Sequence, residues 1–259
     1  SYQSVVAGAQ RWMRLLDRRI PELLFNTLTL AVAVTFLAVL IGVFLAWTVE
    51  RTDIPGRKIW QWLLVLPMVI PPYVGAVTYI ISLGRSGWAK MLWENNSFLI
   101  RLSESFPFDI YSFPGVVFVL TMFTYPYVYL ITGGAIRKMN RNFEEAAASK
   151  GLSSFQIFMK VNLPLLKPAI GAGAVLVFLY VLSDFGAVTM LRYVTFTAAI
   201  YFQRVGFDTS SASILSVILI LITVIVLLIE SKTTRNKKYY QTTNSFRKPQ
   251  ILSLGRFKI

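Results

Sequence analysis

The sequence lacks two residue types that many enzymes use for covalent chemistry. Histidine and cysteine are both absent from the 259 residues, which removes the commonest general base, the commonest metal ligand and the thiolate nucleophile. The sequence also contains no G-x-x-x-x-G-K-[S/T] loop to hold the phosphates of a nucleotide. We therefore expect no catalytic residue, no metal site and no cofactor bound by this chain.

The most informative residues lie in the stretch 141–168, RNFEEAAASKGLSSFQIFMKVNLPLLKP. Asn142 is followed three residues later by Glu145, a capping-box pattern that predicts the start of a short, alanine-rich helix. Gly151 can adopt the left-handed conformation that ends such a helix. The first part of the stretch is thus expected to be a helix of about two turns.

A second short helix is predicted directly after the first. Ser153 and, three residues later, Gln156 form another helix-start pattern. Pro164 limits the continuation of this helix, because the residue before a proline avoids the helical conformation. Residues 142–164 are therefore expected to form two short helices joined by a sharp turn, and we call them the helix pair.

The segments that must position the helix pair are strongly apolar. Hydrophobic residues make up 55% of the chain and charged residues only 15%, which is more apolar surface than a soluble domain can bury. A helix needs about 20 mostly apolar residues to cross a bilayer. The uncharged runs are 23–49, 59–84, 110–136, 168–183 and 209–229. The fold class expected is therefore all-α, a polytopic helical membrane protein with about five transmembrane helices.

The fourth apolar run and the segment after it are the least regular. Run 168–183 is too short to span alone, so we expect it to continue past Asp184 into residues 185–191. Residues 185–208 alternate between apolar and polar types and are too short to cross and return. We interpret them as an amphipathic or re-entrant helix near the outer face.

Prolines predict irregularities in the second and third spans. Pro67, Pro71 and Pro72 lie inside the second run, where each removes a backbone donor. A break at this depth requires neighbouring protein or a water-lined cavity to satisfy the freed carbonyls. It is either a packing kink or an element that lines a pathway. Pro114 is expected to begin the third span and Pro126 to kink it.

The distribution of basic residues predicts the orientation of the chain. Segments 50–58, 137–167 and 231–259 together hold 17 of the 26 lysines and arginines, which favours the cytoplasmic side for all three. The arginine cluster before the first span argues the other way but is smaller. The expected regions are an extracytoplasmic N-terminal segment (1–22), a transmembrane domain (23–230) and a basic cytoplasmic linker or tail (231–259). Since the net charge of +14 follows this topology, we expect no nucleic-acid partner.

The helix pair carries a specific resemblance. Its pattern is Glu-Ala-Ala, three residues, Gly, nine residues, an aliphatic residue, one residue, and Leu-Pro, which resembles the signature loop of ABC importer permeases. Valine replaces the usual isoleucine at one position. The residues that the resemblance assigns to coupling with an ATPase are Glu144, Glu145, Ala146, Ala147, Gly151, Val161, Leu163 and Pro164.

The resemblance implies a function and a set of partners. In this family the loop sits in a cleft of a separate ATPase, which carries ATP and magnesium, and closure of two ATPases moves the helix pair as a lever. The chain would then be a multi-pass inner-membrane permease with a cytoplasmic helix pair and C-terminus. The implied partners are ABC ATPase subunits, a second permease half or homologous copy, a periplasmic substrate-binding protein and membrane lipid.

Three longer segments are similar to ferric-iron importer permeases in particular. They are DFGAVTMLRY from Asp184, TFTAAIYFQ ending at Gln203, and NTLTLAVAVTFLAVLIG from Asn26. Permeases for thiamine, sulfate, molybdate and polyamines share this scaffold, so they stay open as alternatives, as does a secondary transporter. Ferric permeases usually carry two signature loops and this chain has one. We expect one half of such a permease, trimmed at its start, or a half-size permease that dimerises.

A translocation pathway would need polar groups at membrane depth. Asp184 lies among apolar residues and could form a structural ion pair with Arg192, eight residues on. Alternatively its carboxylate could meet a ferric ion, which favours carboxylate and phenolate oxygens, although conduction requires weak binding. The pathway candidates are Asp184, Arg192, Tyr73 and Tyr125, with Tyr79 and Tyr127 as further phenols.

Overall fold

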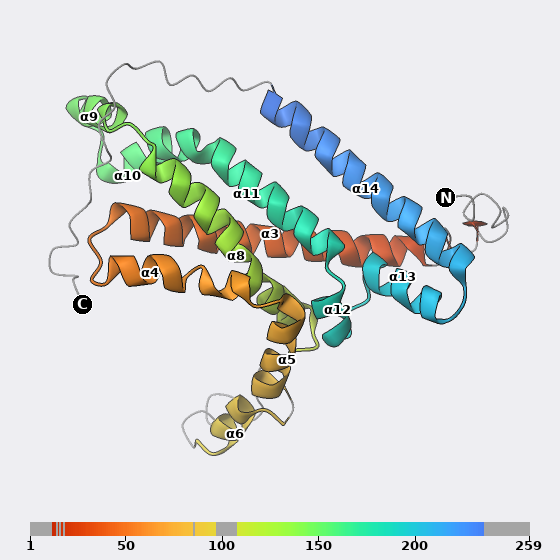
Figure 1. The fold of residues 1–259 in the computed structure, drawn as a ribbon. Coiled ribbons are helices and arrows are strands. Elements are labelled where there is room, and N and C mark those ends of the chain that lie inside the picture. Colours follow the sequence, from red (N-terminus) through yellow and green to blue (C-terminus); the bar gives the residue numbers. More distant parts are fainter. Residues whose placement is uncertain are drawn as a thin grey trace. The chain divides into compact units, whose positions relative to one another are not determined.

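The computed structural model describes residues 12, 13, 15, 17, 19–84, 86–96 and 108–235, and most of them are helical (Figure 1). The elements are α3 (Ile20–Arg51), α4 (Arg57–Leu63), the 3₁₀-helix η1 (Leu66–Val69), α5 (Pro72–Leu83), α6 (Trp88–Glu94), α8 (Phe113–Arg137), α9 (Asn142–Ser149), α10 (Ser154–Ile157), the π-helix η2 (Phe158–Asn162), α11 (Leu163–Ser183), α12 (Gly186–Met190), α13 (Phe196–Val205) and α14 (Thr209–Arg235). The predicted all-α class is confirmed. Most of the expected segment 1–22 and residues 236–259 of the expected tail lie outside the described residues.

Among the described residues, four helices are long and apolar enough to cross a membrane. They are Ile20–Arg51, Phe113–Arg137, Ser154–Ser183 and Thr209–Lys232. The count rises to five if the broken pair Arg57–Val69 and Pro72–Glu94 is one span. The expected number of about five spans therefore agrees with the count that includes the broken pair.

The fourth span differs from its prediction at both ends. It begins at Ser154 and runs without interruption to Ser183, so the expectation that Pro164 would limit the helix is wrong. A π-turn precedes the proline and is closed by Leu163 N–H donating to Phe158 O. This wider turn carries the helix past a residue that has no amide donor. The expected extension beyond Asp184 is also wrong, because the helix ends at Ser183.

Residues 185–208 contain two short helices, α12 and α13, where one was expected. The turn between them includes Arg192, which has a positive φ of 57°. Tyr193 N–H donates to Val188 O at 2.8 Å and closes this turn. Neither helix is long enough to span a bilayer.

The prolines of the second apolar run interrupt it as predicted. Helix α4 ends at Leu63, Pro67 lies in η1, and Pro71 lies directly before α5 with a non-helical ψ of 131°. Pro114 is the second residue of α8, where its missing amide donor costs nothing. Pro126 lies inside α8, which continues through it.

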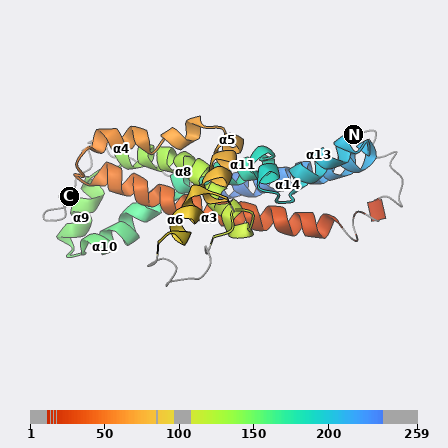
Figure 2. The same cartoon turned by 90° about the horizontal axis from the view of Figure 1, so that it is seen from below.

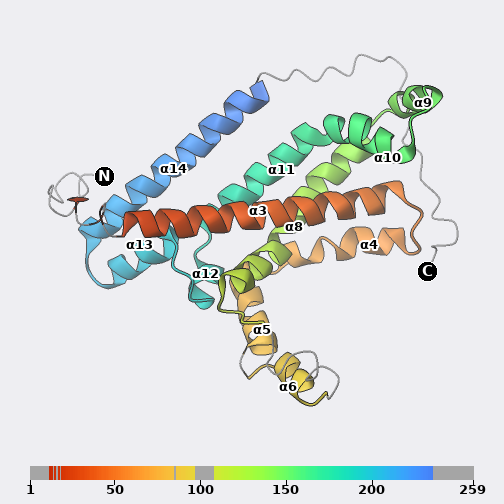
Figure 3. The same ribbon diagram turned by 180° about the vertical axis from the view of Figure 1, so that it is seen from behind.

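The chain divides into two compact units. The first unit comprises residues 1–34, 70–123 and 178–229. Its core joins the first part of α3 to α13 and α14 through Leu23, Phe196 and Leu215, all almost fully buried. Thr27 of α3 accepts a hydrogen bond from Phe196 N–H at 3.1 Å, and Figure 3 shows α13 beside this part of α3.

The second unit comprises residues 35–69, 124–177 and 230–259 and contains the helix pair. In it, α4 lies beside the last turns of α3 (Figure 2). Glycines bring three helices close together around Val128 of α8. A Cβ on Gly42 of α3 would lie 2.8 Å from Val128 Cβ, and one on Gly173 of α11 would lie 3.1 Å from Val128 Cα. Such small residues let membrane helices pack backbone against backbone.

We predict that Gly42→Ala destabilises the protein, because the added methyl would also lie 2.9 Å from the backbone oxygen of Tyr125. Overpacking of this kind costs about 1–3 kcal/mol. Gly171→Ala is the matched control, since a Cβ there has nothing within 4 Å. Thermal unfolding of the purified protein in detergent measures the difference, and an equal midpoint for both variants would contradict the packing role of Gly42.

Candidate functional site

The first helix of the pair, α9, begins as predicted but with a different cap. The N-cap position is Arg141, whose side chain makes no capping hydrogen bond. Asn140 Oδ1 instead accepts from Asn142 N–H at 3.1 Å. The predicted capping box of Asn142 and Glu145 is therefore wrong, because the preceding asparagine takes up the first free amide.

The turn between the two helices follows the prediction closely. Gly151 has φ 79°, its N–H donates to Ala148 O at 2.8 Å, and Leu152 N–H donates to Ala147 O at 3.4 Å. These bonds form a Schellman motif, which needs a residue in the left-handed region. A Cβ on Gly151 would touch nothing, so the backbone conformation is what favours glycine here.

The second helix, α10, starts with the predicted capping box. Ser153 N–H donates to Gln156 Oε1 at 3.0 Å, and Gln156 N–H donates to Ser153 Oγ at 3.4 Å. Helix α10 continues through η2 into α11, so residues 154–183 form one helix.

A buried ion pair attaches α9 to the end of α3. Arg51 Nη2 donates to both carboxylate oxygens of Glu144, each at 2.7 Å. The side chains of Arg51 and Glu144 are only 3% and 14% exposed. A charge removed from water in this way is stable only with a partner, so the pair fixes the position of α9.

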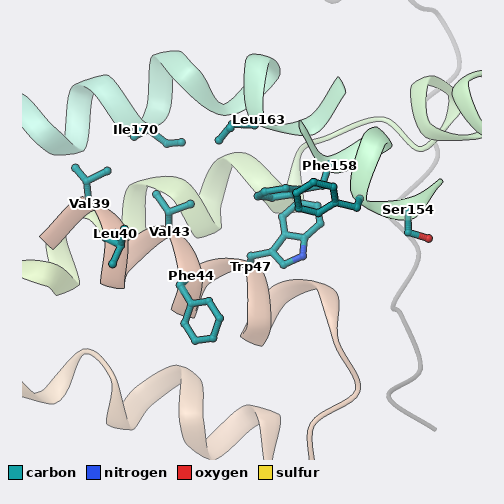
Figure 4. A pocket seen from close by; sticks show the side chains of 10 residues that line it. Val39, Leu40, Val43, Phe44, Trp47, Ser154, Phe158, Leu163 and Ile170 are labelled. Carbon is teal, nitrogen blue, oxygen red and sulfur yellow. The ribbon is translucent and has the colours of Figure 1, made fainter. Parts of the chain in front are cut away.

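Aromatic contacts attach the second helix to the same turn of α3. The guanidinium of Arg51 lies 5.1 Å from the centre of the Trp47 ring, within the range of a cation–π interaction. The Trp47 side chain lies beside Phe158 (Figure 4), and the two rings meet edge-on with centres 4.6 Å apart. One turn of α3 therefore contacts both helices of the pair.

Glu50, next to Arg51, ties α3 to α4 and α8. Its carboxylate accepts hydrogen bonds from Arg57 at 3.1 Å, from Gln61 at 3.3 Å and from Arg137. The Glu50 side chain is 1% exposed, and these three donors offset the cost of burying its charge.

The helical period divides the residues of α9 between two faces. Glu144 and Ala147, three residues apart, share the inner face, and Ala147 is 7% exposed. Glu145 is directed differently: its side chain is 43% exposed and accepts from Arg141 Nε at 2.7 Å. Ala146 and Ala148 are exposed.

The remaining signature residues continue into the fourth span. Val161 lies in the π-turn, and Leu163 and Pro164 are the first two residues of α11. Leu163 also lines an apolar groove of about 730 Å³ beside α3 (Figure 4). The other lining residues are Val39, Leu40, Val43, Phe44, Trp47, Ser154, Phe155, Phe158 and Ile170.

Comparison with known families identifies the chain. A family model described as "Binding-protein-dependent transport system inner membrane component" matches residues 38–231. The chain belongs to this family. The predicted resemblance is thereby confirmed, and together with the apolar helices this membership makes the chain a multi-pass inner-membrane protein.

Relatives of this chain are named as permeases for different substrates. The Fe(3+)-transport system permease protein FbpB 2 of Haemophilus influenzae is 33% identical over 213 residues, 82% of this chain and 37% of that protein. The sulfate transport system permease protein CysW of Synechococcus elongatus is 29% identical over 68% of this chain and 58% of its own length. The molybdenum transport system permease protein ModB of Escherichia coli is 30% identical over 63% of this chain and 69% of its own length. This chain thus spans little more than a third of the Haemophilus relative.

Solved structures confirm the fold of the family. A bacterial ABC transporter involved in the import of alginate has a TM-score of 0.68 at 15% identity, covering 88% of this chain and 84% of that one. The inward-facing MetNI methionine ABC transporter has a TM-score of 0.63 at 16% identity, and the match covers 88% of this chain and 99% of that one. The polytopic helical architecture is therefore that of ABC transporter chains.

The pathway candidates in the first unit are only partly brought together. A Cβ on Gly186, two residues after Asp184, would lie 2.8 Å from Tyr73 Cβ, so α12 packs against the start of α5. The expected Asp184–Arg192 ion pair is not formed between these two described residues. Asp184 Oδ2 accepts from Val188 N–H at 3.1 Å, while Arg192 lies over the Tyr111 ring at 5.2 Å. Tyr125 belongs to the second unit and is buried.

Sequence reasoning missed the residues that hold the helix pair in place. Trp47, Glu50 and Arg51 lie at the end of an apolar run, where the sequence pattern predicts only a span and its orientation. A signal was present, since adjacent opposite charges at the end of a span can be buried if each finds a partner. However, Arg137 lies 87 residues from Glu50, and Glu144 lies 93 residues from Arg51. No local sequence pattern reveals such distant partners.

We predict that Gly151→Val loosens the turn of the helix pair while Gly151→Asn is tolerated. A β-branched residue in the left-handed region costs roughly 1–2 kcal/mol, whereas asparagine visits it readily. Hydrogen–deuterium exchange of residues 142–152 should be faster in the valine variant only. Gly134→Val, at a position with no neighbour within 4 Å, is the control. Unchanged exchange in Gly151→Val would show that the turn does not depend on this conformation.

Proposed function

We propose that this chain is the transmembrane subunit of an ATP-driven importer and that its helix pair docks onto a separate ATPase. The observation that carries the proposal is the two-faced helix pair. Its inner face is fixed to α3 by the Arg51–Glu144 pair, while its outer face presents a partly exposed carboxylate beside exposed small and aromatic residues.

The outer face has the composition of a protein-binding surface. Phe155 is 72% exposed and Met159 is 45% exposed, and Phe143 is also exposed. Exposed apolar side chains gathered on polar helices mark contact sites for other proteins. Ala146 leaves room for a partner to approach the backbone, and the Glu145 carboxylate offers a directional contact to basic groups.

The connection between the helix pair and the membrane supports a mechanical role. Because α10, η2 and α11 form one uninterrupted helix, closure of an ATPase around ATP and magnesium would move α10 and the fourth span together. Rocking of the spans would then alternate access to a pathway. In this proposal the chain binds no nucleotide, contributes no catalytic residue and has its helix pair and C-terminus on the cytoplasmic side, with residues 1–22 outside.

The proposed partners follow from the same mechanism. Two ATPase subunits would engage two helix pairs, so a second permease half or a homologous copy completes the assembly. A periplasmic binding protein would deliver the substrate to the outer side, and lipid would surround the apolar helices. A nucleic acid is not among the proposed partners.

Ferric iron is the proposed substrate. Support comes from the Haemophilus relative, whose similarity covers 82% of this chain, more than that of the sulfate and molybdenum relatives described above. Those relatives favour a second candidate of opposite charge, an oxyanion such as sulfate or molybdate. Asp184 and Tyr73, on the packed elements α12 and α5, are the oxygen-bearing groups proposed to line the pathway, with Tyr125 and Arg192 as weaker candidates.

We predict that Glu145→Lys prevents stable assembly with the ATPase while the chain still inserts in the membrane. Reversal of an interface charge leaves like charges facing each other, and a loss of about 2–5 kcal/mol weakens binding by more than ten-fold. Glu94→Lys is the matched control, because Glu94 also forms an exposed i,i+4 ion pair. Copurification of the ATPase and substrate uptake are measured. Normal transport by a Glu145→Lys, Gly151→Pro variant would contradict the proposal.

We predict that the complex reconstituted in liposomes hydrolyses ATP faster when a ferric-loaded binding protein is added. Binding proteins loaded with sulfate or molybdate serve as controls and should have no effect. Stimulation by an oxyanion-loaded protein alone would replace iron with the second candidate. If none of these loaded binding proteins changes the rate of hydrolysis, both ferric iron and the oxyanions are contradicted as substrates.

A further inference from the structure

We infer that the last turn of α3, with Trp47, Glu50 and Arg51, is the joint that passes movement of the helix pair to its neighbours, and that Glu144 belongs to this joint and not to the ATPase-facing surface. The inference rests on the proposed function, because it assigns a route to a movement that the ATPase would impose. It concerns only residues of the second unit.

The Arg51–Glu144 pair is built to stay closed during such a movement. Arg51 Nη2 lies 2.7 Å from both oxygens of Glu144, and both side chains are withdrawn from water. Separating them would leave two buried charges without partners, which is far more costly than opening an exposed pair. A force on α9 therefore reaches α3 through this contact.

A second attachment prevents α9 and α10 from pivoting about the first. Trp47 is one turn before Arg51 on the same face of α3, and its ring contacts Phe158 at the start of the π-turn. Arg51 also lies over the Trp47 ring. Two contacts on different helices of the pair fix its orientation as well as its position, so the pair and the end of α3 would move as one body.

Glu50 spreads the movement to two further helices. It is adjacent to Arg51, so its side chain leaves α3 in a different direction. Its carboxylate is bonded to Arg57 and Gln61 of the α4 region and to Arg137 at the end of α8. Together with the covalent continuity of α10 and α11, this network links the helix pair to α3, α4, α8 and α11.

The exposures of the two neighbouring carboxylates separate their roles. The Glu144 side chain is 14% exposed and its two oxygens are both engaged by Arg51. The Glu145 side chain is 43% exposed beside Arg141. An approaching ATPase can therefore reach Glu145 without disturbing the joint, whereas Glu144 would have to abandon a buried partner.

A charge-swap experiment tests the joint in the complete reconstituted complex. Arg51→Glu and Glu144→Arg should each retain the ATPase, because the Glu145 face is intact, but transport per ATP hydrolysed should fall several-fold. The double variant Arg51→Glu, Glu144→Arg should recover most of the loss. Glu94→Arg, at an exposed ion pair outside the joint, should leave the ratio unchanged.

The outcomes distinguish the inference from the proposed function. Normal coupling in both single variants, or no recovery in the double variant, would overturn the joint. Loss of the ATPase from Glu144→Arg but not from Arg51→Glu would place Glu144 on the ATPase-facing surface. If the unaltered complex does not retain an ATPase at all, the proposed function fails instead.

A crosslinking test avoids dependence on reversed charges. Because residues 1–259 contain no cysteine, Arg51→Cys and Glu144→Cys introduce the only pair within them that a short bis-methanethiosulfonate reagent can bridge reversibly. Transport should be low before crosslinking and should rise several-fold once the bridge closes the joint, then fall again on reduction. A bridge that blocks transport, or one that leaves it unchanged, would show that the contact does not transmit movement.

Discussion

The burial of two opposite charges, Arg51 and Glu144, is the constraint on which the site depends. Removing either partner would strand the other away from water, at a cost of roughly 3–5 kcal/mol. That contact connects residues 93 positions apart and determines where α9 lies. With eight residues, α9 is too short to be stable as an isolated helix, so contacts with the rest of the protein, this one among them, add to what its own caps supply.

Shape and placement of the helix pair thus have different origins. The shape is local: the positive φ of Gly151 and the reciprocal hydrogen bonds of Ser153 and Gln156 bend the chain within a few residues. The placement is not local, because it comes from Trp47, Glu50 and Arg51 on a distant helix. Local bonds make the pair rigid, and the distant ones connect it to the spans, which is what a mechanical link requires.

This division explains how much the sequence could predict. Apolar runs, the interruption by Pro71 and Pro72, the Gly151 turn and the capping box of α10 all follow from local rules, and the structure confirms them. The predictions were wrong where a distant or competing interaction determined the local structure. The π-turn accommodates Pro164, the Asn140 side chain accepts from the amide of Asn142 where Asn142 was expected to cap, and Asp184 bonds the backbone of α12 in place of Arg192.

The adjacent residues Glu144 and Glu145 show the limit most clearly. The sequence presents them as equivalent, and the family pattern begins at the second. Successive residues on a helix point about 100° apart, so the two carboxylates point in different directions, and the pattern cannot say which of them binds Arg51. Once it is placed, Glu144 and Ala147 form the inner face and Glu145 remains outside. Glu144 therefore holds α9 against α3, and the Glu145 carboxylate stays partly exposed.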